Sequence, residues 1–80
     1  MEIQKGSLVY SKAGRDKGKL LLVVKTDGEY AYTADGESRT VQKPKKKKFK
    51  HLQKTNLIAE IKSEPENFEV RKILAEYKTK

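Results

Sequence analysis

The 80-residue chain contains no cysteine and a single histidine. Without cysteine it can form neither a disulfide framework nor a thiolate zinc site, and it has no thiol nucleophile. His51 cannot complete a standard zinc set by itself, and it lies among lysines that repel a cation. None of the serines has the Gly-x-Ser-x-Gly context of a nucleophile elbow. We therefore expect no metal centre, no cofactor, no small-molecule substrate and no catalytic activity.

The chain also lacks a long apolar run. Its longest, Leu20 to Val24, is far shorter than the roughly 20 residues that span a bilayer. Met1 to Lys5 contain no apolar segment of the kind found in a signal peptide. These observations predict a cytoplasmic protein with no membrane partner.

Positive charge is abundant and unevenly distributed, with a net charge of +8. Residues 1–41 hold seven basic and six acidic residues, and residues 55–80 hold five of each. Residues 42–54 hold seven lysines and no acid. This distribution predicts a partner with dense negative charge; nucleic acid and an anionic membrane both have it, and of the two we expect nucleic acid. The alternative is a solvated lysine loop that aids solubility.

Short apolar or alternating segments separated by turn signals predict a small β-barrel. Asp27-Gly28 and Asp35-Gly36 are hairpin signals, because a type I′ turn needs positive φ at both central residues. The expected strands are Leu8–Tyr10, Lys19–Thr26, Glu29–Ala34, Arg39–Gln42 and His51–Gln53. We expect a mainly β fold, with this barrel in residues 1–55 and a helical extension in residues 56–80.

The C-terminal part changes to a helical period. Apolar residues recur at positions i, i+3, i+4 and i+7, namely Val70, Ile73, Leu74 and Tyr77. This spacing places them on one face of an amphipathic helix, and we expect that face to pack on the barrel. Asn67 is the expected N-cap, and a capping box of Ser63 with Glu66 is the alternative. Leu57, Ile58 and Ile61 are ambiguous, and we favour a short helix capped by Thr55 or Asn56.

The segment Ser11–Lys19 combines two glycines with four basic residues. Glycine permits close backbone approach and positive φ, and the basic side chains can reach phosphate. The segment is not a P-loop, because Lys19 is followed by leucine rather than by serine or threonine. A charged hairpin loop without a binding role is the alternative.

The order of several motifs resembles a known family. The N-terminal part looks like a KOW motif: Gly6-x-x-Val9 is followed by Gly14-x-x-Lys17-Gly18-Lys19 and then by an apolar strand. With Asp35-Gly36, Arg39 and the run from Lys43-Pro44 to His51-Leu52, residues 3–55 resemble small bacterial RNA-binding proteins. These are similar to the KOW ribosomal proteins of the archaeal and eukaryotic large subunit, fourteen-E type. The resemblance implies an SH3-like barrel of five strands, RNA binding and a connection to the ribosome and translation.

We expect the lysine-rich segment to neutralise phosphates and to be mobile until RNA binds, and the Ser11–Lys19 loop to supply shaped contacts. An unpaired base could stack on Tyr10, Tyr30, Tyr32 or Phe49. The expected RNA-binding residues are Lys12, Arg15, Lys17, Gly18, Lys19, Arg39, Lys43, Lys45, Lys46, Lys47, Lys48, Phe49, Lys50 and His51. The expected partner is large-subunit ribosomal RNA. A general nucleic-acid binder and a protein-interaction module of the transcription machinery are the alternatives.

Overall fold

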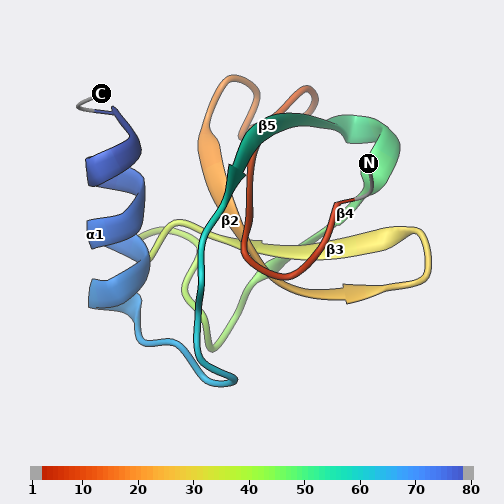
Figure 1. Cartoon of the computed structure of the whole chain (residues 1–80). Helices are drawn as coiled ribbons and strands as arrows, with labels where there is room; N and C mark the ends of the chain where they lie inside the picture. Colours follow the sequence, from red (N-terminus) through yellow and green to blue (C-terminus); the bar gives the residue numbers. More distant parts are fainter. Residues whose placement is uncertain (1–2, 79–80) are drawn as a thin grey trace.

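The computed structural model describes residues 3–78 and has the mainly β fold that the sequence predicts. One antiparallel sheet has the strand order β4-β3-β2-β1-β5, and a helix follows it. The sheet is strongly curled, and α1 lies beside it (Figure 1). The described residues include no helix that is long and apolar enough to cross a membrane. The elements are β1 (Ser7–Ser11), β2 (Leu20–Asp27), β3 (Tyr30–Ala34), β4 (Lys45–Lys48), the 3-10 turn η1 (Phe49–His51), β5 (Leu52–Ile58) and α1 (Asn67–Lys78).

Residues 20–23 of β2 are buried on both faces of the strand, which explains the unbroken apolar sequence of this part. Leu20 and Leu22 face α1 and pack in one cluster with Leu8, Val70 and Leu74. On the opposite face lies a second cluster, made of Val9, Leu21, Val23, Ala31 and Leu52. The expected buried strand and the expected packing of the helix on the sheet are therefore both present.

A two-residue turn joins β2 to β3, as the Asp27-Gly28 signal predicts. Asp27 pairs with Tyr30, so Gly28 and Glu29 are the central residues. Gly28 has φ of +60°, whereas Glu29 is not at positive φ. These signs fit a type II′ turn rather than the expected type I′ turn, because only the first central residue is left-handed.

The expected fourth strand over Arg39–Gln42 is wrong, because these residues belong to a loop between β3 and β4. The Asp35 carboxylate accepts the backbone N–H groups of Glu37 and Arg39, both at 2.8 Å, and this bends the chain. The N–H of Val41 donates to Asn67 Oδ1 at 2.8 Å, so it does not take part in a strand ladder. Asp35-Gly36 therefore opens an anchored loop rather than a two-residue hairpin.

The lysine run itself forms the fourth strand, so the expectation of a mobile segment is also wrong. Lys45 to Lys48 pair in antiparallel register with Thr33 to Tyr30 of β3. Strand pairing turns successive side chains to opposite faces, which separates neighbouring ammonium groups. Four lysines on an edge strand also disfavour pairing with another sheet.

Strand β5 extends through Ile58, so the predicted short helix after Thr55 is wrong and the predicted strand is too short. The Thr55 hydroxyl donates to the backbone oxygen of Leu8 at 2.6 Å, where the register of β1 and β5 shifts. The N–H of Ala59 donates to Gly6 O at 2.7 Å. Contacts with a distant strand therefore decide the conformation of this segment.

Helix α1 begins at Asn67, but neither expected cap is used. Glu66 occupies the cap position: its N–H donates to Glu69 Oε1 at 3.0 Å, and its carbonyl accepts from Val70 N at 3.1 Å. The Asn67 side chain instead ties the helix to the loop between β3 and β4, since its amide donates to Gln42 Oε1 at 2.9 Å.

Candidate functional site

The Ser11–Lys19 loop has a fixed shape. The N–H of Gly18 donates to Ser11 O at 2.8 Å, and the N–H of Ser11 donates to Lys19 O at 3.0 Å. Gly14 and Gly18 have φ of +75° and +87°, values that favour glycine over other residues. Three basic side chains project from the loop into solvent: Lys12, Arg15 and Lys17. The loop can therefore present cations in a defined arrangement.

Asp16, in the middle of this basic loop, is only 4% exposed. Its carboxylate lies 3.1 Å from Arg39 Nε and 3.6 Å from Lys47 Nζ. Lys19 Nζ completes the group at 3.9 Å. These four residues form what we call the Asp16 cluster. It joins the loop to β4 and to the loop between β3 and β4.

The Asp16 cluster engages three of the expected RNA-binding residues in internal ion pairs. The side chain of Lys47 is 9% exposed, and that of Arg39 is 29% exposed. Lys19 is 46% exposed, but it also contacts Asp35 Oδ2 at 3.4 Å and donates to Ser38 Oγ at 3.0 Å. These three cations hold the site together, and Lys47 is the least accessible to a phosphate.

Asp35 is a second anionic anchor beside Lys19. Its burial disfavours the charged form, but the N–H groups of Arg39 and Glu37, the Ser38 hydroxyl and Lys19 favour it more strongly. The net effect holds the pKa of Asp35 below its ordinary value. A charged Asp35 therefore fixes the loop that carries Arg39.

The remaining lysines of β4 and η1 are exposed. On β4 these are Lys45, Lys46 and Lys48, and η1 adds Lys50 together with His51. The N–H of Lys12 donates to His51 O at 2.8 Å, which places η1 beside the Ser11–Lys19 loop. Lys43 is also exposed, in the loop that precedes β4. The fold thus brings most of the predicted site residues onto adjoining elements.

The aromatic candidates lie in different environments. Phe49 is half-buried and packs against the cluster that contains Val9 and Leu52, so it contributes to the interior. Tyr10 is 37% exposed and lines a groove beside α1. Tyr30 and Tyr32 are half-buried, and each has a lysine ammonium over its ring.

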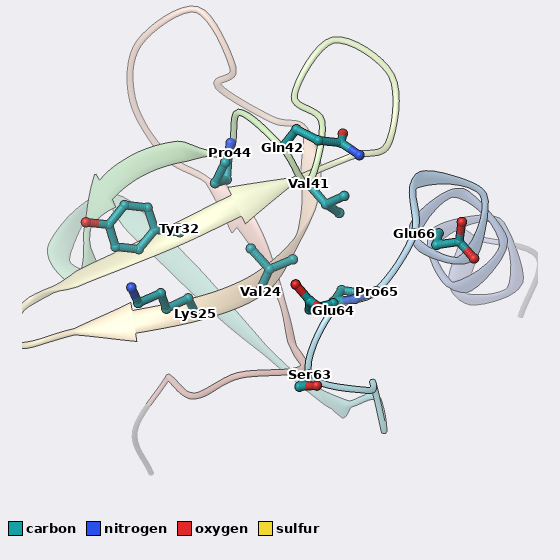
Figure 2. A pocket seen from close by; sticks show the side chains of 10 residues that line it. All are labelled: Val24, Lys25, Tyr32, Val41, Gln42, Pro44, Ser63, Glu64, Pro65 and Glu66. Atoms are coloured by element: carbon teal, nitrogen blue, oxygen red, sulfur yellow. The ribbon is translucent and has the colours of Figure 1, made fainter.

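A groove of about 700 Å³ begins at Tyr32 and Lys25 and runs towards the segment before α1 (Figure 2). Val24, Val41 and Pro44 give it an apolar lining, and Glu64 lies at its other side. Among the described residues, no group of three or more histidine, cysteine, aspartate or glutamate side chains could hold a metal ion. The groove offers an aromatic and apolar surface beside the charged side chains of Lys25, Glu64 and Glu66.

Two features of the site have little or no signal in the sequence. The role of Asp16 has one local signal, a single acid between Arg15 and Lys17 in a basic loop, but its partners are distant in sequence. The position of Lys25 opposite Tyr32 follows only from strand register.

Among known proteins, no family model and no curated sequence matches this chain.

Proposed function

We propose that this chain is an RNA-binding protein that acts on the ribosome, with the Ser11–Lys19 loop and the β4–η1 segment as its contact surface. One observation carries the proposal. The Lys12–His51 hydrogen bond and the Lys47–Asp16 ion pair bring together two basic segments that lie far apart in sequence. The exposed cations of these two segments are Lys12, Arg15, Lys17, Lys45, Lys46, Lys48 and Lys50.

The two segments would bind in different ways. Lysine ammonium groups on β4 and η1 neutralise phosphates and release counterions, which gives affinity without reading sequence. The loop is held by the Asp16 cluster, so Arg15 and Lys17 approach the RNA in a fixed geometry. An arginine guanidinium can also grip a phosphate with two hydrogen bonds.

The resemblance to KOW ribosomal proteins supports large-subunit ribosomal RNA as the target and an SH3-like barrel as the identity of the fold. The glycines that carry the resemblance, Gly6, Gly14 and Gly18, all have positive φ. A residue with a side chain is strained in that conformation, so the backbone itself accounts for glycine at these positions. The curled sheet of five strands is consistent with this proposal.

Binding to a fragment of large-subunit RNA, measured as a function of salt, tests the proposal. If about four to six phosphates are contacted, log K should fall against log salt with a slope of about −3 to −5. A slope near zero would overturn the electrostatic account. Equal affinity for this RNA and for DNA would instead indicate a general nucleic-acid binder, and salt-insensitive binding to a protein would indicate an interaction module.

A further inference from the structure

Aromatic and basic side chains alternate on the outer face of β2, β3 and β4. Directly opposed residues in an antiparallel sheet point to the same face. Tyr32 is opposite Lys25 on one side and Lys46 on the other, and Tyr30 is opposite Lys48. We call these five residues the tyrosine strip.

Two of the three cations of the strip lie against its rings. Lys46 Nζ is 4.4 Å from the centre of the Tyr30 ring, and Lys25 Nζ is 5.6 Å from the centre of the Tyr32 ring. These distances are in the range of cation–π attraction, which contributes little when the ammonium stays exposed to water. An incoming ligand can therefore replace such a contact at small cost.

Neither tyrosine belongs to the interior of the sheet. On β3, Ala31 lies between the two tyrosines and Thr33 follows them, and both are fully buried on the opposite face of the strand. Tyr32 lines the groove described above, where its ring lies beside the side chain of Lys25 (Figure 2). The exposed part of the strip thus combines aromatic surface with positive charge, which suits a ligand that has both a flat apolar surface and negative charge.

The spacing of the tyrosines matches bases that are not stacked on each other. Residues i and i+2 of a strand are about 6.8 Å apart, because each residue advances the strand by about 3.4 Å. Bases in a duplex follow at about 3.4 Å along each strand. Two consecutive bases that each cover one ring must therefore be unstacked, as they can be in single-stranded RNA.

We propose that the tyrosine strip binds two consecutive unpaired bases on Tyr30 and Tyr32, so that the preferred ligand is a single-stranded RNA segment. On binding, Lys46 moves from the Tyr30 ring to the phosphates of that segment, and Lys48 moves to them from solvent. On the β2 side, Asp27 lies opposite Tyr30 and Glu64 shares the groove with Lys25, so the negative charges offset Lys25 there. The two lysines of β4 therefore favour a phosphate backbone that runs along β4. This inference rests on the proposed RNA binding and names the form of RNA that the site takes.

The test compares a uridine-rich single strand of about ten nucleotides with a duplex of equal length, at one salt concentration. The variants are Tyr30→Leu, Tyr32→Leu and the double variant, which remove the rings but keep apolar side chains on the strand. The matched controls are Tyr30→Phe and Tyr32→Phe, which keep the rings, and Phe68→Leu, which removes an exposed aromatic ring on α1, outside the strip. Circular dichroism establishes that each variant is folded.

Each leucine substitution should weaken single-strand binding by about 5-fold to 150-fold, because base–aromatic stacking contributes that much per ring. Duplex binding, the salt slope and the affinities of the three controls should stay unchanged. Equal losses of affinity for single strand and duplex, or no loss of affinity with the double leucine variant, would overturn the proposal that the tyrosine strip binds unpaired bases. A wild-type protein that binds neither RNA would instead overturn the proposed function, so the two failures are distinguishable.

Discussion

Lys47 Nζ lies 3.6 Å from Asp16 Oδ2, with the two side chains 9% and 6% exposed. One member of a run of four lysines thus points inward and is an internal ion-pair partner. Its neighbours on the strand, Lys46 and Lys48, point to the opposite face, since side chains alternate along a strand. Residues of the same type in one run therefore have different roles.

The inward position of Lys47 predicts unequal effects of identical substitutions on β4. Lys47→Gln leaves a buried carboxylate with one partner fewer, and it should lower the free energy of unfolding by about 1–3 kcal/mol. Lys48→Gln is the matched control on the same strand and should change it by less than about 0.5 kcal/mol. Urea denaturation measures both. Equal effects would mean that Lys47 does not hold Asp16 in solution.

Gly28 and Gly36 predict a second contrast. Both have positive φ, but a Cβ on Gly28 would meet nothing within 4 Å, whereas a Cβ on Gly36 would lie 2.5 Å from Asn67 O and 2.8 Å from Arg71 Cγ. Gly28→Ala should cost about 1 kcal/mol from backbone strain. Gly36→Ala should cost a further 1–3 kcal/mol, roughly, because it forces α1 away from the loop. Similar melting temperatures for the two variants would contradict this packing.

Asp35 predicts a pH dependence of stability. Its pKa is lowered in the folded state, so the folded protein binds a proton less readily than the unfolded chain does. The stability that charged Asp35 contributes is present above its unfolded pKa, near 4, and is lost as the pH falls through the lower folded pKa. Asp35→Asn should therefore flatten the decrease in unfolding free energy between pH 4 and pH 2, approximately.

Thermal unfolding of the wild type and of Asp35→Asn across this pH range measures the contribution. The difference between the two proteins should be largest at neutral pH and smallest at the acid end. A constant difference would show that Asp35 gains nothing from the N–H groups of Glu37 and Arg39 in its charged form.

The loop and the lysine strand predict separable effects on RNA binding. Arg15→Gln with Lys17→Gln keeps both loop glycines, so the loop should still form but lose its positioned cations. This variant should reduce the affinity ratio between large-subunit RNA and an unrelated structured RNA. Replacing Lys45, Lys46 and Lys48 by glutamine, with Lys47 kept to preserve the fold, should weaken both RNAs about equally, because phosphate contacts carry little sequence information.

The affinity ratio at fixed salt is the measurement. A ratio near one for the wild type would contradict a specific RNA site. A ratio that is high and is lost only with the three lysines would move recognition from the loop to β4.

Local sequence determined those elements whose pattern is complete within a short window. The apolar run from Leu20 to Val24 predicts a buried strand, the Asp27-Gly28 signal predicts a turn, and the spacing of Val70 and Leu74 predicts a helix. In each case the periodicity of the buried side chains is itself the cause of the structure, so it can be read from the chain. The clustering of positive charge in residues 42–54 is likewise a property of the sequence alone.

The tertiary structure decided what depends on distant partners. Four consecutive lysines become strand β4 because β3 supplies their hydrogen bonds and Asp16 receives Lys47. Leu57 and Ile58 become strand rather than helix because the edge of β1 is free to pair. The tyrosine strip exists because strand register sets Lys25 and Lys46 on either side of Tyr32. Hydrogen-bond register and burial of charge are relations between segments far apart in the chain, and neither segment specifies them by itself.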